Sequence, residues 1–294
     1  MWPADIAGPV LELRSWGEPD VRRFPWFEPP PETAISQAET LLGRLGAITH
    51  RGVTELGKRL VRLPVHPRIG RLLVEGHALG CPARAALLAA LLSERDPFLR
   101  SQDRREAAHS TDSDVLDRVQ ALEEFDQSRR RHSGVGNLDH GGAQFVLRAR
   151  DQLLDAVLDA CGPARRVRVP SDEALMRSLL AAFPDRVARR REPGGRRAVM
   201  VGGRGVRLWE KSAVREHELF VCVDIEEIGG SEALVRQASA IEPHWLPADR
   251  LQVSVDVDFD PARERVIAHK RTRYDDLIME EAATDVPDSR DVSD

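Results

Sequence analysis

Arginine is the residue type with the clearest chemical potential in this sequence, and it gathers in two stretches of the second half of the chain. A guanidinium offers a planar fork of N–H donors that fits the oxygens of a phosphate group. The alternative interpretation is a solubilising face on which nearby Asp and Glu neutralise the arginines. We predict phosphate contact, and the candidate nucleic-acid-binding residues are Arg196, Arg197, Arg204, Arg207, Lys270, Arg271 and Arg273.

Motifs of common active sites are missing from the sequence. It contains no GxxxxGK[ST] phosphate loop, no HExxH zinc motif, no GxSxG nucleophile elbow and no GxGxxG turn opening a helix. Asp256, Asp258 and Asp260 alternate along one predicted strand. A solvated strand face is favoured there over a cation site, because no carbonyl-rich loop accompanies the three acids. We therefore predict no catalytic residue, no metal site and no cofactor bound by this chain.

The composition is that of a globular protein large enough for two or more small domains, with 294 residues, 41% hydrophobic and 31% charged. The formal net charge of -5 gives no basic signal over the whole chain. Cys81, Cys161 and Cys222 form no CxxC pair, which favours a reducing compartment over a zinc site or a disulfide framework. No apolar run approaches the roughly 20 residues of a membrane span, and no signal peptide is visible. We expect a cytoplasmic protein without membrane contact.

The stretch LPVHPRIGRLL places prolines on both sides of a histidine, immediately before a helical pattern. A residue that precedes proline is held out of the α region, so Leu63 and His66 are predicted to be extended. Pro67 suits the first turn of a helix, where its missing N–H costs nothing. We interpret Pro64, His66, Pro67 and Arg68 as a structural hinge between two domains, and His66 as a packed residue of that hinge rather than a ligand or base.

Helical patterns fill the part of the chain before Pro184. Apolar residues recur at helical spacing in residues 35–45 and 54–63, with a short polar turn between them. This arrangement fits a winged-helix module over residues 31–65, and a corner of an ordinary bundle fits it about equally well. Further stripes predict a helical bundle over residues 66–184, including a helix in ARAALLAALLSERD that is apolar nearly all round and therefore buried.

Short alternating runs separated by Gly, Pro or charge replace the helical patterns after Pro184. They predict a small OB-like antiparallel β-barrel over residues 185–274, with a generic β-sandwich as the alternative. The acidic sequence of residues 275–294 predicts a disordered tail. The fold class that follows is α+β and multidomain, with a winged helix, a helical bundle and then the barrel.

Several stretches resemble the bacterial HrpB-type ATP-dependent helicases of the DEAH-box RNA helicase superfamily. The junction TELGKRLVRLPVHPRIGRLL resembles the step from winged helix to helical bundle in the wider DEAH group. The stretches that resemble the HrpB type are ADIAGPVLELRSWG, LLSERDPF, AFPDRVARRR, VGGRGVRL, QASAIEPHWL and RYDDLIMEE. The likeness keeps the family's order and covers nearly the whole chain.

The resemblance implies a role beside an ATP-dependent motor. In this family two RecA-like domains bind ATP and Mg, and a winged helix, a helical ratchet-like bundle and an OB-like domain follow them. We expect this chain to lack both RecA-like domains, to be truncated or split, and to have no ATPase activity of its own. Residues 1–30 would be a remnant of the second RecA-like domain with a Pro-rich linker. The implied partners are single-stranded RNA or DNA and a RecA-like helicase core.

Three functional hypotheses follow from these observations. The leading one is a C-terminal accessory region of an HrpB-type helicase that closes over a single strand with its bundle and OB-like domain. The alternative is a freestanding protein–protein adaptor built on the helical bundle. A winged-helix transcription regulator is disfavoured, because the helix carrying Lys58, Arg59 and Arg62 is short and the proline hinge follows it immediately.

Overall fold

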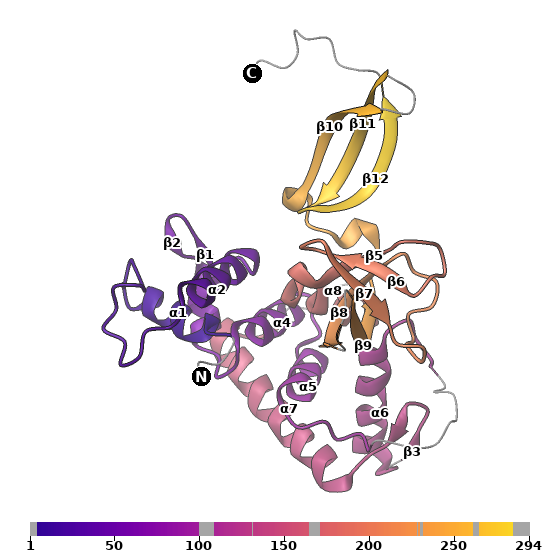
Figure 1. Cartoon of the computed structure of the whole chain (residues 1–294). Helices are drawn as coiled ribbons and strands as arrows, with labels where there is room; N and C mark the ends of the chain where they lie inside the picture. Colours follow the sequence, from indigo (N-terminus) through magenta and orange to yellow (C-terminus); the bar gives the residue numbers. More distant parts are fainter. Residues whose placement is uncertain are drawn as a thin grey trace.

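The computed structural model describes residues 5–99, 109–130, 132–164, 171–227, 229, 232–260 and 265–284. Within this part of the chain, the longer helices precede Phe183 and the longer strands follow it, as Figure 1 shows. The α+β, multidomain fold class predicted from the sequence is confirmed. No helix among the described residues combines the length and the apolar character that crossing a membrane requires.

The N-terminal region is a three-helix unit with one small hairpin. Helix α1 packs on both α2 and α3, so it has partners within the described chain. Thr54 is the N-cap of α3, and its side chain accepts a hydrogen bond from the Gly57 N–H. The elements are α1 (Ala7–Ser15), α2 (Glu32–Arg44), β1 (Ile48–Thr49), β2 (Gly52–Val53) and α3 (Glu55–Val61).

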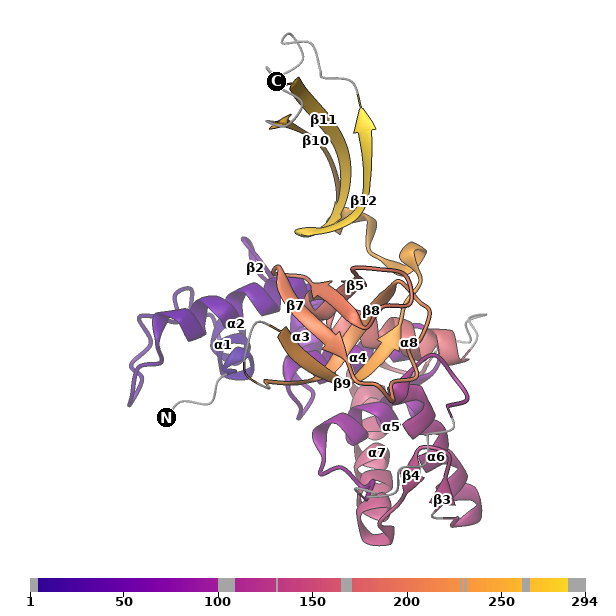
Figure 2. The same ribbon diagram turned by 45° about the vertical axis from the view of Figure 1, so that its right-hand side comes forward.

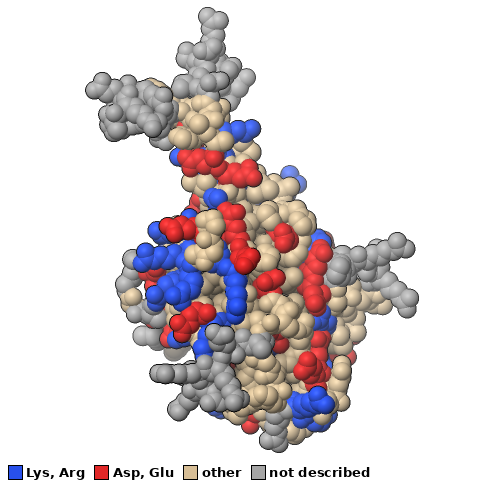
Figure 3. Space-filling view, turned by 90° about the vertical axis from the view of Figure 1, so that its right-hand side faces the viewer, with Lys and Arg blue, Asp and Glu red and all other residues tan. Residues whose placement is uncertain are grey.

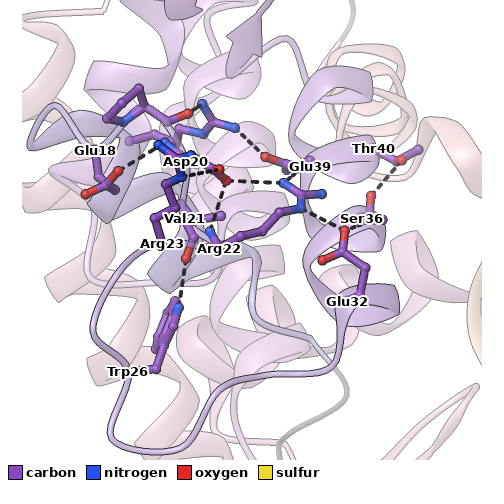
Figure 4. Close-up of polar contacts among 12 residues, drawn as sticks. Glu18, Asp20, Val21, Arg22, Arg23, Trp26, Glu32, Ser36, Glu39 and Thr40 are labelled. Atoms are coloured by element: carbon purple, nitrogen blue, oxygen red, sulfur yellow. Dashed lines mark hydrogen bonds and ion pairs between the residues drawn. The ribbon is translucent and has the colours of Figure 1, made fainter.

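Polar contacts hold the connection between α1 and α2, which contains the Pro-rich stretch (Figure 4). Arg22 donates from Nε to Glu32 at 2.7 Å and from Nη1 to Glu39 at 3.0 Å. The Trp26 indole N–H donates to the Val21 carbonyl at 2.8 Å, and Val21 is fully buried. The connection is therefore fixed against α2 by both polar and apolar contacts.

The helical bundle is built around α5, which is largely buried, as its continuous apolar sequence predicted. Helix α5 contacts α4 and α7, and α8 lies along α4. The approach of α4 to α5 is so close that a Cβ on Gly76 would lie 2.2 Å from the Cβ of Ala85. The elements are α4 (Pro67–Ala78), α5 (Pro82–Ser93), α6 (Asp114–Ser128), β3 (His132–Ser133), β4 (Gly136–Asn137), α7 (His140–Cys161) and α8 (Ser171–Ala182).

A closed five-stranded barrel follows the bundle, with strand order β5-β6-β7-β9-β8. The predicted small β-barrel is confirmed and the β-sandwich alternative is wrong, because the strands close into one sheet. One detail differs from the prediction: β7 and β9 are parallel, since the chain crosses through β8 between them. The elements are η1 (Pro184–Arg186), β5 (Val187–Arg190), β6 (Arg197–Met200), β7 (Arg204–Leu208), β8 (Leu219–Glu226) and β9 (Glu232–Ala240).

The last strands form a separate antiparallel sheet that projects away from the barrel (Figures 1 and 2). The barrel thus ends at β9 and not at residue 274, as the sequence had predicted. The predicted boundary was wrong because alternation indicates a strand without indicating which sheet the strand joins. The predicted disordered tail from residue 275 is wrong for 277–284, which pair with β11; residues 285–294 lie outside the described chain. The elements are η2 (Pro243–Trp245), η3 (Ala248–Arg250), β10 (Leu251–Asp260), β11 (Arg265–Tyr274) and β12 (Leu277–Thr284).

The buried carboxylate of Asp114, in the first turn of α6, ties the bundle to the barrel. It accepts hydrogen bonds from the Ala213 N–H at 2.6 Å, the Ser212 hydroxyl at 2.7 Å and the Ala238 N–H at 2.9 Å. Burial raises the pKa of Asp114 above its ordinary value, although these three donors oppose the shift. The barrel therefore has a polar attachment to α6 in addition to apolar packing.

Candidate nucleic-acid interface

The outer face of β6 and β7, the second and third strands of the barrel, displays two opposed arginines. Ala198 and Val206 fill the barrel interior, so strand alternation turns Arg197 and Arg207 outward. The register places these two arginines directly opposite each other. Like charges in such a cross-strand pair destabilise a sheet. Barrel stability therefore does not explain the pair.

The acidic neighbours of these arginines compensate them incompletely. Arg197 lies 3.4 Å from Glu232, Arg196 lies 3.9 Å from Glu210, and Arg204 pairs with Glu227. Exposed ion pairs of this kind contribute little and are screened by salt, so an incoming phosphate can compete with them. The ion pairs among the described residues include none for Arg207, which is exposed.

The surface at the level of the barrel matches this arrangement. Figure 3 shows Lys and Arg gathered on one side of the molecule below the projecting sheet, with Asp and Glu among and beside them. An OB-like barrel commonly binds oligonucleotides with the face of its second and third strands. Of the predicted residues, Arg197 and Arg207 share this outward face, whereas Arg196 and Arg204 lie at opposite ends of the β6–β7 hairpin.

The other three predicted residues lie on β11, in the projecting sheet. Lys270 is exposed, but Arg271 and Arg273 are engaged by acids on the neighbouring strands. Arg271 donates to Asp256 at 2.6 Å and to Glu281 at 3.0 Å, and Arg273 donates to the same Asp256. The hydrogen bonds from Arg273 and then Arg271 hold the pKa of Asp256 well below its usual range. The charges of these two arginines are therefore compensated within the sheet.

Trp209 belongs to the basic face of the barrel and was missed by the sequence analysis. It follows the last residue of β7, and its backbone N–H donates to the Val235 carbonyl at 2.9 Å, so the β7–β9 pairing continues through it. The signal was present in the sequence GVRLWEK. With Val206 and Leu208 inside the barrel, the next outward positions are those of Arg207 and Trp209.

The turn between β11 and β12 contacts the β6–β7 hairpin, which carries Arg197 and Arg207. Both carboxylate oxygens of Asp276 accept from the N–H of Gly202 in the β6–β7 turn, at 2.9 and 3.0 Å. The Tyr274 side chain is fully buried and its hydroxyl donates to the Pro184 carbonyl at 3.1 Å. Asp275 adopts a φ of 51° and is held by Arg250. This turn therefore joins the projecting sheet to both the barrel and η1.

The predicted hinge residues lie where the N-terminal region, the bundle and η1 meet. His66 is the N-cap of α4 and Pro67 is in its first turn, as the sequence predicted. His66 Nδ1 accepts from the Arg68 N–H at 3.2 Å, and its Nε2 lies 3.1 Å from Asp5. Arg68 reaches Asp185 in η1 with two hydrogen bonds, at 2.6 and 2.7 Å. Pro64 and His66 also line a cleft of about 700 Å³ beside α5 and α7.

Two carboxylates of this junction carry shifted pKa values. The close approach of His66, whose Nε2 lies 3.1 Å from the carboxylate, lowers the pKa of Asp5 to about 2. Burial of Asp185 favours its neutral form, but the hydrogen bond and positive charge of Arg68 outweigh burial and leave its pKa below the ordinary value. Both carboxylates are thus stabilised in the ionised form by the residues predicted to form the hinge.

The contacts of Asp256 bear on the alternating acids of β10, which were considered above as a possible cation site. Its carboxylate is occupied by Arg271 and Arg273, while the side chains of Asp258 and Asp260 lie outside the described ones. Within the described part of the chain, no three His, Cys, Asp or Glu side chains are grouped so that they could hold a metal ion. Cys222, in β8, is fully buried, and burial raises its pKa to about 12.

Comparison with known proteins gives the family relation. Residues 66–142 match the ratchet-like helicase-associated domain, HA2. The chain is 27% identical over 267 residues to the ATP-dependent RNA helicase HrpB of Escherichia coli, covering 89% of this chain and 26% of that protein. It is 33% identical over 125 residues to HrpA of the same organism, covering 38% of this chain and 10% of that protein. The chain thus spans only a minor part of the length of these relatives.

Solved structures agree on the fold. A crystal structure of the E. coli DExH-box NTPase HrpB matches 97% of this chain and 31% of that chain, with a TM-score of 0.70 and 23% sequence identity. The helical bundle is thus similar to the ratchet-like helicase-associated domain, and the fold of nearly the whole chain is similar to part of HrpB. The likeness to the E. coli helicase HrpB extends over most of the chain, at 27% sequence identity.

Proposed function

We propose that this chain is a C-terminal accessory region of an HrpB-type helicase and that it binds single-stranded nucleic acid through the outer face of β6 and β7. The observation that carries the proposal is the opposed pair Arg197 and Arg207, two outward guanidiniums that are not matched by an equal number of close acids. A phosphate between them would relieve their repulsion and accept hydrogen bonds from both. Arg196 and Arg204, at the two ends of the same hairpin, would contact the phosphates on either side.

Binding of this kind is tolerant of sequence, because guanidinium–phosphate contacts carry no base information. It is also sensitive to salt, since each neutralised phosphate releases counterions. Lys270, Arg271 and Arg273 are not part of this proposal, because two of the three are engaged by Asp256 within their own sheet. The proposed ligand is single-stranded RNA or DNA.

The junction at His66 and Arg68 supports a role in holding the domains in register. It connects Asp5 in the N-terminal region, the first turn of α4 and Asp185 in η1 through side-chain contacts. A RecA-like helicase core is the proposed partner, and motion of that core would reach the barrel through this junction. We expect the chain by itself to bind a strand without hydrolysing ATP.

Fluorescence anisotropy with a labelled single-stranded oligonucleotide tests the proposal. The full chain is titrated at low and at high salt, beside the double variant Arg197→Gln/Arg207→Gln. Arg23→Gln is the matched control, because that side chain is 87% exposed and lies in a different region. We expect salt-sensitive binding that the control retains and the double variant loses by roughly tenfold or more, since hydrogen bonds to charged groups are worth about 1.5–3 kcal/mol each. Equal binding by both variants would contradict it.

A further inference from the structure

We propose that Trp209 is a stacking platform for an unpaired base of the strand whose phosphates contact Arg197 and Arg207. This inference rests on the proposed function and names the part of the ligand that the arginines do not recognise. Tryptophan presents a large aromatic face that any base can stack on, so such a contact binds single strands without strong sequence preference.

The first support is that Trp209 lies outside both hydrophobic cores of the described chain. It belongs to neither of the two hydrophobic cores, although Trp26 and Trp245 both pack against the larger one. A buried or half-buried tryptophan ordinarily contributes through its large apolar area. The half-buried Trp209 sits outside both cores, so its indole ring is not used to fill the barrel interior.

The second support is its rigid position beside the arginines. The hydrogen bond from its backbone N–H to the Val235 carbonyl keeps Trp209 in β register beyond the end of β7. Residues two apart on a strand share a face and lie about 7 Å apart. Arg207 and Trp209 are related in this way, so one nucleotide can place its phosphate on Arg207 and its base on the indole.

The third support is the charge around the ring. Lys211 Nζ lies 5.9 Å and Arg236 Cζ lies 5.6 Å from the indole centroid. Arg236 is also held by Glu226 at 2.6 Å, which fixes it beside the ring. Cations next to an aromatic platform hold the backbone of a strand whose bases stack, and this combination is typical of single-strand binding surfaces.

The experiment compares two probes on two proteins. The probes are a labelled oligothymidylate and an abasic strand with the same number of phosphates, each about twelve nucleotides long, within the usual range for one OB-like domain. The proteins are the full chain and its Trp209→Ala variant. We expect the full chain to bind oligothymidylate roughly tenfold more tightly than the abasic strand, and Trp209→Ala to bind both probes alike.

The outcomes separate this inference from the proposed function. Salt-sensitive binding of both probes with equal affinity by the full chain overturns the role of Trp209 and leaves the phosphate contacts standing. No binding of either probe overturns the proposed function itself. Trp209→Phe guards against misfolding, because it keeps an aromatic face and should keep most of the preference for bases. If Trp209→Phe and Trp209→Ala lower the affinity for both probes equally, Trp209 is structural and the inference is wrong.

Discussion

The barrel face and the projecting sheet both carry neighbouring arginines, but the two regions use them differently. On β11, Arg271 lies opposite Glu281 in register and also reaches Asp256, so its charge is answered from both neighbouring strands. On the barrel, the residue opposite Arg197 is Arg207. The exposed fractions agree, at 20% for the Arg271 side chain and 71% for that of Arg197. The cross-strand partner thus distinguishes an arginine that stabilises a sheet from one that is available to a ligand.

Exchanging the two pairs for glutamine should give opposite results. Arg197→Gln/Arg207→Gln should weaken oligonucleotide binding by roughly tenfold or more and leave the melting temperature nearly unchanged, because surface substitutions usually stay within about 0.5 kcal/mol. Arg271→Gln/Arg273→Gln should leave binding within about twofold and lower the melting temperature, because Asp256 loses both donors. Anisotropy and thermal unfolding on the same samples measure both. If both pairs affect binding equally, the two regions do not differ as described.

Removing the acid that engages the sheet arginines should make that sheet resemble the barrel. In Asp256→Asn, Arg271 and Arg273 lose their shared carboxylate, so we expect them to attract phosphates and to tighten oligonucleotide binding by about threefold, chiefly at low salt. The same change should destabilise the chain, which a denaturant titration would detect. Glu280→Gln is the matched control, since it removes one negative charge from the exposed face of the same sheet and leaves the Asp256 carboxylate in place. Unchanged affinity at low salt would show that the Asp256 carboxylate does not prevent Arg271 and Arg273 from binding phosphate.

Removing an acid on the barrel should have a smaller effect of the same sign. Glu232 is the carboxylate close to Arg197, and Glu232→Gln should tighten binding by about twofold, because an exposed ion pair is worth less than about 1 kcal/mol. Combining Glu232→Gln with Arg197→Gln should abolish the gain. A gain that persists without Arg197 would assign it to the overall charge of the chain.

Acid should weaken the contact between Asp5 and His66 at the hinge. The pKa of Asp5 is about 2 in the folded chain against 3.8 for the ordinary group, so its stabilising effect is complete above pH 3.8 and is lost as the pH falls toward 2. Because Asp5 is half exposed, we expect a loss below about 1 kcal/mol. Unfolding titrations of the full chain and of Asp5→Asn between these pH values should converge. If the unfolding free energies of the two proteins keep the same difference over this pH range, the contact between Asp5 and His66 does not stabilise the fold.

Much of the fold could be predicted from local sequence. The cap at Thr54, the first turn at Pro67 and the buried helix α5 follow from residue preferences and periodicity alone. The separation of β10 to β12 from the barrel could not be predicted, because period-two alternation is the same in either sheet. The acidic letters of β12 suggested disorder, yet its backbone pairs with β11 and Glu281 meets Arg271.

The sequence predicted which arginines cluster, but it could not predict which of them are paired with acids in the fold. Clustering in sequence located the arginines of the barrel and of β11, but ion pairing depends on residues far along the chain, such as Asp256 for Arg271. Because these two residues are far apart in sequence, their ion pair could not be predicted from the sequence. Trp209 was missed because a single aromatic after a short strand has no motif, and its importance follows only from its absence from both cores.

The salt dependence of binding tests the central claim most directly. The slope of log affinity against log salt counts the phosphates that the protein neutralises, at about 0.7 for each contact with a single strand. The account predicts that Arg197→Gln/Arg207→Gln lowers this slope by about 1.4, while Arg271→Gln/Arg273→Gln leaves it unchanged. An unchanged slope in the barrel variant, or an equal fall in the sheet variant, would contradict it.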